Sequence, residues 1–322
     1  MSISILVPIY NVEKYIERCA RSLFEQTYPD IEYIFVNDCT PDNSIEILKN
    51  VIEDYPQRKK HVSIITHDKN RGLAAARNTA VENCQTDFLI HVDSDDYIEK
   101  DAVEKLVIKQ KEDDYDIVTG NSHIIHQDCK KLLRENEPID KEELILLYIK
   151  PVINHVIWGR MIRTSLYKEN NIQALEGCNI GEDHQVIPRL FYYAKKVSSI
   201  ENAIYNYDCT NPNSCMSQSS SIEKFGNKVK QDLLSFDCLR KFFETCPEDI
   251  YKQQVYQELC RYAYTKASFF SLHQQPHFFN LLWKYFFSID KKYRKNLPGR
   301  CDALSLFLKS HYFTALLISK LR

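Results

Sequence analysis

Short apolar runs alternate with segments of helical spacing over the first 120 residues, and this alternation constrains the fold of the 322-residue chain more than any other feature. The runs are rich in β-branched and aromatic residues, and helical segments of about 10–15 residues separate them. Continuous apolar strands joined by such helices form a mostly parallel sheet that carries helices on both faces. We therefore expect an α/β, Rossmann-like fold, with strands at 3–10, 31–38, 61–68, 87–93 and 115–120.

Acidic residues gather where the expected strands end. The strand-ending residues are Tyr10, Asp38, Asp68 and Asp93, so three of these four positions are acidic. Ligands of open parallel sheets bind outside the carboxyl ends of the strands. The sequence therefore predicts a functional site at this edge of the sheet.

The segment VDSDD at 92–96 brings neighbouring carboxylates together directly after the fourth expected strand. One interpretation is a strand-to-helix turn in which Asp95 or Asp96 caps the next helix. The other is a site for a hard cation, Mn²⁺ or Mg²⁺, which binds few protein carboxylates and completes its shell with water and substrate phosphates. If the segment is extended, Asp93 and Asp95 point the same way and Ser94 points away.

The ends of the first two strands admit a structural and a functional interpretation. Pro8 and Tyr10 either close a strand before a helix cap at Asn11, or form a platform on which a nucleotide base stacks. Asp38 leaves its strand straight into a turn, where its carboxylate could accept the imide N–H of uracil. Each feature alone is weak evidence for a nucleotide site.

A basic segment precedes an alanine-rich helix in HDKNRGLAAARN at 67–78. Lys69 and Arg71 come before Gly72, which opens the helix that contains Arg77. Cations around a helix N-terminus suit phosphate groups. A surface loop with a capping glycine is the alternative.

Two later segments also have a structural alternative. Glu182 and Asp183 follow Gly181 and begin a helical stretch, where acidic residues are favoured in any case. Trp158, in the segment WGR, fits either an aromatic wall beside a ligand or a core position.

The pattern loosens from 121 to 215, and the chain then becomes helical. We expect a hairpin at 123–133, a helix at 141–149, two short strands ending in IYNYD, and a polar boundary segment at 210–221. Beyond it the spacing predicts helices at 222–243, 249–272, 276–289 and 302–319. The predicted organisation is a catalytic domain at 1–215, with parts at 1–120 and 121–215, followed by a helical region at 216–322.

Taken together and in order, these motifs resemble the inverting family-2 glycosyltransferases with the GT-A fold, of the type that builds bacterial cell-surface polysaccharides. The resemblance covers about residues 1–215 and rests on the segments VPIYN, VNDCTPDNS, NRGLAAARN, VDSDD, WGRM, GED, IYNY and NSCMS. The sequence departs from the family at Cys39–Thr40–Pro41, where relatives often have a small glycine-containing turn. Because Cys tolerates positive φ less well than Gly, the departure affects the expected geometry of that turn.

The resemblance implies a role for each matching residue. It implies a nucleotide-sugar site formed by Pro8, Tyr10, Glu13, Asp38, Lys69, Gly72, Arg77, Asp93 and Ser94. It implies that Asp93 and Asp95 hold Mn²⁺ or Mg²⁺. Asp183 would be the general base, and Trp158 and Glu182 would shape the acceptor side.

The implied reaction moves one sugar from a nucleotide sugar, most often UDP-linked in this family, to a hydroxyl of a glycan or lipid-linked oligosaccharide, with inversion. A sugar-phosphate nucleotidylyltransferase is the first alternative, but it should carry a Gly- and Arg-rich loop where this chain has PIYNVEKYIE. The second is a non-catalytic GT-A-like binding protein. The absence of a QxxRW segment and of a long apolar stretch disfavours the processive polysaccharide synthases.

Charge and cysteine content indicate where the protein acts. Residues 276–322 contain nine Lys/Arg and two Asp/Glu, so this end carries +7 while the whole chain carries −2. These C-terminal helices either pack on the catalytic domain or contact an anionic inner-membrane surface, and we expect no nucleic-acid partner. Eleven cysteines without a CxxC pair, and an N-terminus without a basic leader, predict a cytoplasmic protein, peripheral on the membrane if the second interpretation holds.

Overall fold

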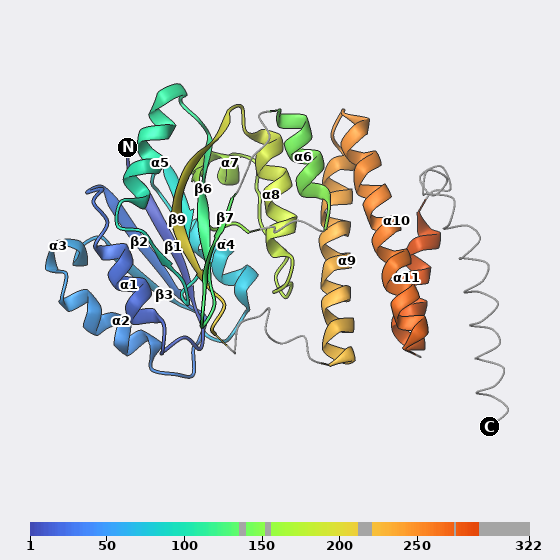
Figure 1. Ribbon diagram of the computed structural model, residues 1–322, viewed down its shortest axis with the longest axis horizontal. Coiled ribbons are helices and arrows are strands. Elements are labelled where there is room, and N and C mark those ends of the chain that lie inside the picture. Colours follow the sequence, from blue (N-terminus) through green and yellow to red (C-terminus); the bar gives the residue numbers. More distant parts are fainter. Residues whose placement is uncertain (135–139, 152–155, 212–220, 274, 290–322) are drawn as a thin grey trace. The chain divides into compact units, whose positions relative to one another are not determined.

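The computed structural model describes residues 1–134, 140–151, 156–211, 221–273 and 275–289 (Figure 1). The chain divides into two compact units, one formed by 1–148 with 154–221 and the other by 149–153 with 222–322. The first unit contains the sheet and the second contains three helices among the described residues. The predicted boundaries at 120/121 and 215/216 stay predictions.

The first unit is built on a mixed sheet of nine strands within the described residues. Its order is β3-β2-β1-β4-β8-β6-β9-β5, and β7 pairs with β6. The strands are β1 (Ile3–Ile9), β2 (Ile31–Asn37), β3 (Val62–Thr66), β4 (Phe88–His91), β5 (Tyr97–Ile98), β6 (Ile117–Ile125), β7 (Lys130–Leu133), β8 (Arg160–Arg163) and β9 (Val197–Asp208). The four predicted strands β1 to β4 are all present and mutually parallel.

The parallel order stops at β8. This strand lies between β4 and β6 and is antiparallel to both. The expected fifth strand, at 115–120, is the start of the longer β6 and is separated from β4 by β8. Strand β6 forms the predicted hairpin with β7 and runs parallel to β9. The two short strands expected before residue 208 are one continuous strand, β9.

Helices cover both faces of the sheet. Those of the first unit are α1 (Ile16–Phe24), α2 (Ser44–Glu53), α3 (Pro56–Lys59), α4 (Leu73–Asn83), α5 (Ala102–Asp113), α6 (Lys141–Ile149), α7 (Thr164–Glu169) and α8 (Glu182–Tyr193). Residues of α1, α2 and α5 join the odd-numbered residues of β1 in one buried cluster. The buried alanines of α4 lie outside that cluster, and α4 packs against β1 and β2. The predicted α/β arrangement is confirmed.

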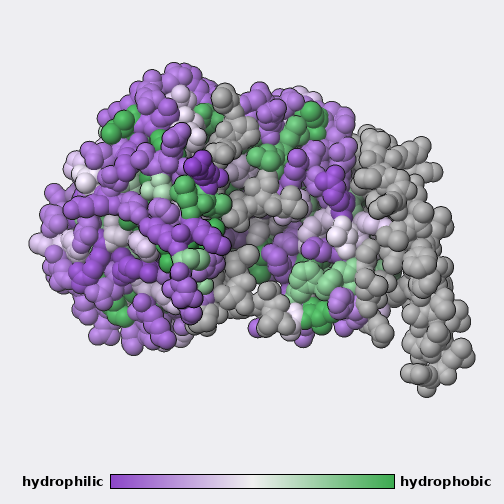
Figure 2. Space-filling view, viewed as in Figure 1, coloured by the Kyte–Doolittle hydropathy of each residue, from purple (hydrophilic) through white to green (hydrophobic). Residues whose placement is uncertain are grey.

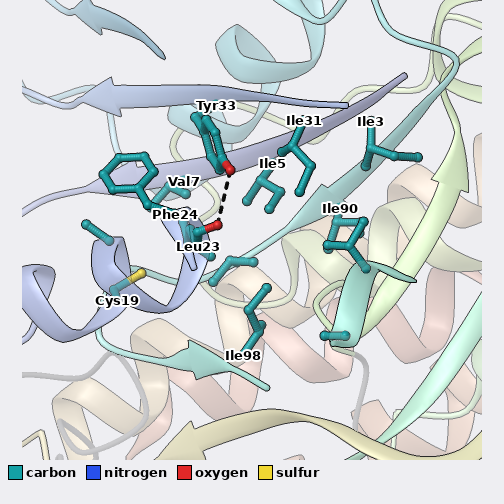
Figure 3. Packing of buried hydrophobic residues seen from close by; sticks show 14 of the residues in the cluster. Ile3, Ile5, Val7, Cys19, Leu23, Phe24, Ile31, Tyr33, Ile90 and Ile98 are labelled. Carbon is teal, nitrogen blue, oxygen red and sulfur yellow. Dashed lines mark hydrogen bonds between the residues drawn. The ribbon is translucent and has the colours of Figure 1, made fainter. Parts of the chain in front are cut away.

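The buried cluster packs strands β1, β2 and β4 against α1. Figure 3 shows isoleucines of β1, β2 and β4 together with Leu23 and Phe24 of α1. The Tyr33 hydroxyl donates a hydrogen bond of 3.1 Å to the Leu23 carbonyl, so even the polar atom of this buried ring is satisfied. Hydrophilic residues cover most of the first unit's surface on the face drawn in Figure 2.

The second unit contains α9 (Ile222–Glu244), α10 (Asp249–Leu272) and α11 (Pro276–Ser288). Its buried residues in α9 recur every three or four positions, as in Val229, Leu233 and Phe236, which is the spacing of one apolar helix face. The helices predicted at 222–243, 249–272 and 276–289 are confirmed to within one residue. The one predicted at 302–319 lies outside the described residues. Within those residues no helix is both long enough and apolar enough to span a bilayer.

Candidate active site

The acidic segment after β4 is a turn. The Asp96 N–H donates to the Asp93 carbonyl at 3.0 Å, so the expected extended conformation of 93–95 is wrong. The helix-cap interpretation of Asp95 and Asp96 is also wrong, because β5 follows the turn and α5 begins only at Ala102. The buried Ser94 lies inside the turn, between the two partly exposed carboxylates.

Asp93 and Asp95 each keep one carboxylate oxygen without a hydrogen bond from another described residue. Asp93 Oδ1 accepts from Arg77 at 2.7 Å, and Asp95 Oδ2 accepts from Asn211 at 2.9 Å. Burial first, and then the charge of Asp93, raises the pKa of Asp95. Carboxylate oxygens are hard ligands, and the raised pKa shows that a second negative charge beside Asp93 is unfavourable without a cation. Both features fit Mn²⁺ or Mg²⁺. The described residues contain no cluster of three or more His, Cys, Asp or Glu that would enclose a metal. The metal assignment stays a prediction.

Arg77 connects the acidic turn to the acidic start of α8. Its buried guanidinium donates to Asp93 Oδ1 and Glu182 Oε1, both at 2.7 Å, and to Asp183 Oδ1 at 2.5 Å. Burial lowers the pKa of Arg77, but the charges of Asp183, Asp93 and Glu182 outweigh it and raise the pKa well above its usual value. One cation therefore brings together two motifs that lie about ninety residues apart in the sequence. The predicted contact of Arg77 with a nucleotide sugar stays a prediction.

Burial is the main influence on both carboxylates at the start of α8. Burial and the charge of Asp183 raise the pKa of Glu182 to about 8. Burial raises the pKa of Asp183 to about 6 while Arg77 opposes the shift, and Asp183 Oδ2 also accepts from the Ile157 N–H at 3.2 Å. The Arg77 guanidinium and the Ile157 N–H both stabilise the ionised form of Asp183, and this form is the one that can accept a proton.

Asp38 organises the turn that leads into α4. Its oxygens accept from the N–H groups of Arg71 at 2.8 Å and Gly72 at 2.7 Å. His67 Nδ1 lies 2.7 Å from Asp38, and its Nε2 lies 2.9 Å from the Thr79 hydroxyl. Sequence reasoning missed His67, which directly follows β3 and precedes Asp68. The base-binding role of Asp38 stays a prediction.

Gly72 is required by both backbone conformation and space. Its φ is 91°, and a Cβ there would lie 2.2 Å from Asn179 Oδ1. Arg71 forms an ion pair of 2.5 Å with Glu176 in the same segment as Asn179. The segment that leads into α8 therefore lies directly on the turn held by Asp38.

The remaining predicted donor residues are at the expected edge. Tyr10 is 47% exposed and leaves its ring open to a partner, while Pro8 is buried within β1. Glu13 Oε2 accepts from the Asn43 N–H at 3.3 Å, and Lys69 is exposed. Their contacts with a nucleotide sugar stay predictions.

The turn after β2 adopts an unfavourable backbone conformation. Cys39 has a φ of 56°, in the left-handed region that glycine occupies most easily. The turn therefore has the geometry of a glycine-containing one although it carries a cysteine.

Trp158 is buried beside the acidic turn. It is 4% exposed, and its ring stacks on Tyr205 with centroids 4.3 Å apart and an interplanar angle of 8°. Tyr207 stacks on the same indole at 5.5 Å. The structure thus gives Trp158 a core position, and its predicted contact with an acceptor stays a prediction. Tyr205 belongs to the IYNY segment, and no local pattern in that segment assigns it a role.

Comparison with known proteins identifies the family. The sequence model described as "Glycosyl transferase family 2" matches residues 4–170. The chain therefore belongs to glycosyl transferase family 2. The "Uncharacterized glycosyltransferase EpsJ" of Bacillus subtilis is 32% identical over 224 residues, which are 66% of this chain and 62% of EpsJ. The "Poly(ribitol-phosphate) beta-N-acetylglucosaminyltransferase TarS" of Staphylococcus aureus is 26% identical over 94% of this chain and 51% of TarS.

Solved structures confirm the GT-A fold. A crystal structure of S. aureus TarS 1-349 in complex with UDP-GlcNAc has a TM-score of 0.74 at 21% identity, and the match covers 97% of this chain and 88% of that chain. The mannosyltransferase PcManGT from Pyrobaculum calidifontis, in complex with GDP-Man and Mn²⁺, has a TM-score of 0.54 at 14% identity and is covered over 80% of its chain. The predicted GT-A domain followed by a helical region is confirmed.

Proposed function

We propose that this protein is an inverting, metal-dependent glycosyltransferase that moves one hexose or N-acetylhexosamine from a UDP-sugar to a hydroxyl of a glycan or lipid-linked acceptor. Family membership supports the reaction class. The UDP-GlcNAc complex of TarS supports a UDP-linked donor, and the Mn²⁺ in the PcManGT complex supports a metal.

The observation that carries the proposal is the position of Arg77 between Asp93 and the Glu182–Asp183 pair. A glycosyl transfer needs two kinds of group around one anomeric carbon: one that stabilises the departing diphosphate and one that removes a proton from the acceptor. The guanidinium of Arg77 contacts both acidic motifs at 2.5–2.7 Å. The candidate metal ligand Asp93 and the candidate base Asp183 therefore both contact the Arg77 side chain.

In the proposed step, the acceptor oxygen forms a bond to the anomeric carbon as the bond from that carbon to the diphosphate oxygen breaks. The acceptor proton moves to Asp183, and the electron pair of the broken bond leaves with UDP. Attack from the face opposite to the leaving group inverts the anomeric centre, as in inverting glycosidases, where water takes the acceptor's place. Burial raises the pKa of Glu182 and so favours its neutral form, which cannot take up that proton.

Asp93 and Asp95 would hold the metal through the carboxylate oxygens that accept no hydrogen bond from another described residue. Bound Mn²⁺ or Mg²⁺ would supply Lewis-acid stabilisation of the charge that gathers on the diphosphate. Arg77 holds Asp93 by one oxygen only, which leaves the other available.

We assign the protein to surface polysaccharide biosynthesis at the cytoplasmic face of the membrane. The support is the kind of acceptor in the name of TarS and the +7 charge of residues 276–322. Most of that segment, from 290 onwards, lies outside the described residues.

The proposal is tested first by binding. UDP should raise the melting temperature of the wild type more in the presence of Mn²⁺ than in its absence, and the Asp95→Ala variant should lose the Mn²⁺-dependent part. A panel of nucleotide sugars then identifies the donor through metal-dependent release of UDP or another nucleotide diphosphate. Mn²⁺-independent behaviour of the wild type, together with no turnover of any nucleotide sugar, would contradict the proposal.

A further inference from the structure

The end of β9 holds the acidic turn from one side through Tyr205. This side chain is fully buried, and its ring is fixed by the stack on Trp158. Its hydroxyl accepts from the Asp93 N–H at 3.1 Å and donates to Asp96 Oδ2 at 2.7 Å. A hydroxyl can donate one hydrogen bond and also accept, and here it does both. The two partners, Asp93 and Asp96, lie at opposite ends of the same turn.

Backbone pairing reinforces this connection. Ile98 of β5 pairs with Tyr205, and Tyr97 pairs with Asn206, so the chain leaving the turn is hydrogen-bonded to the strand that carries the tyrosine. The buried Asp96 also accepts from the Asp208 N–H at 2.8 Å. The far end of the turn is thus fixed to β9 by both side-chain and main-chain bonds.

Two more residues after Tyr205 hold the middle of the turn. Asp208 forms an ion pair of 2.7 Å with Arg18, which in turn donates to the Asp95 carbonyl at 2.7 Å. The Asn211 amide donates to Asp95 Oδ2 at 2.9 Å. This bond orients the Asp95 carboxylate and leaves Oδ1 for another partner.

We infer that Tyr205, assisted by Asp208 and Asn211, is the positioning residue that sets where the carboxylates of Asp93 and Asp95 lie for a divalent cation. The inference rests on the proposed metal-dependent function. None of the three side chains has to touch the ion, because each acts on the backbone or the second oxygen of a ligand. Removal of such outer partners costs about 10- to 100-fold in metal affinity.

The test uses Tyr205→Phe, which keeps the ring and its stack on Trp158 but removes the hydroxyl. Tyr207→Phe is the matched control, because Tyr207 stacks on the same indole and makes no hydrogen bond to the acidic turn among the described residues. Mn²⁺ binding in the presence of UDP is measured from the electron paramagnetic resonance signal of the free ion. We expect about tenfold weaker Mn²⁺ binding for Tyr205→Phe and an unchanged value for Tyr207→Phe.

A second readout separates positioning from general damage. UDP binding measured in metal-free buffer should be the same in both variants and the wild type, because the turn that Asp38 organises is untouched. If Tyr205→Phe does not fold, Asn211→Ala provides the same test with a smaller structural change, and its Mn²⁺ affinity should also fall several-fold. Wild-type Mn²⁺ affinity in a folded Tyr205→Phe or, failing that, in Asn211→Ala overturns the inference. Absence of Mn²⁺ binding in the wild type overturns the proposed metal dependence itself.

Discussion

Replacing Asp183 with Asn tests the most specific chemical claim, the assignment of the base. The amide keeps the size of the side chain but cannot take a proton from the acceptor. Arg77 keeps its hydrogen bonds to Asp93 and Glu182, so the centre of the site retains two of its three contacts. The change therefore removes proton transfer and leaves the scaffold in place.

The expected magnitude follows from the role. Loss of general-base assistance lowers the rate by about 10²- to 10⁴-fold, equivalent to about 3–5 kcal/mol of transition-state stabilisation. The neighbouring Glu182→Gln variant is the matched control. Burial raises the pKa of Glu182 and favours its neutral form, and Gln resembles that neutral form. We expect a smaller loss of rate in Glu182→Gln than in Asp183→Asn, because the amide oxygen of Gln can still accept from Arg77.

The assay is the rate of UDP release from the donor in the presence of acceptor, with UDP and Mn²⁺ binding measured in parallel. Asp183→Asn should bind UDP with Mn²⁺ as the wild type does and yet transfer hardly any sugar. Turnover of Asp183→Asn within tenfold of the wild type would refute the assignment of the base. A large loss in Glu182→Gln together with nearly normal turnover in Asp183→Asn would assign the base to Glu182 instead.

Three further predictions follow from the same contacts. Because Asp183 must be ionised and its pKa is raised from 3.8 to about 6, kcat/KM should rise with pH with a midpoint near pH 6 and level off about one unit higher; a midpoint near pH 4 would contradict this. Gly72→Ala should lower the free energy of unfolding by about 1–3 kcal/mol in chemical denaturation, because φ is 91° and Asn179 occupies the space that a Cβ would need. Gly177→Ala is the control and should cost less, because its φ of 80° is similar but no atom lies within reach of the added Cβ; equal losses would contradict the steric argument. The full chain should co-sediment with anionic vesicles at low salt and dissociate at high salt, and equal binding to neutral vesicles would remove the role of the basic C-terminal segment.

The sequence by itself was sufficient for the local architecture of the catalytic domain. Continuous apolar runs are typical of strands buried on both faces, and segments of about 10–15 residues between them have the length of helices, so β1 to β4, α4 and the helices of the second unit can be predicted from residue order. The placement of Asp38 and Asp93 at one edge follows from the same reasoning, because the carboxyl ends of parallel strands meet there.

The tertiary structure decided which of these groups meet. Arg77 contacts Glu182 and Asp183 more than a hundred residues away, and no local pattern encodes that pairing. The insertion of β8 between β4 and β6 depends on long-range backbone pairing, which weak local preferences do not fix. The acidic segment is a turn because Tyr205, from a strand about 110 residues further on, bonds to both of its ends. Buried charges and hydroxyls must find partners in space, and those partners are set by the packing of whole elements.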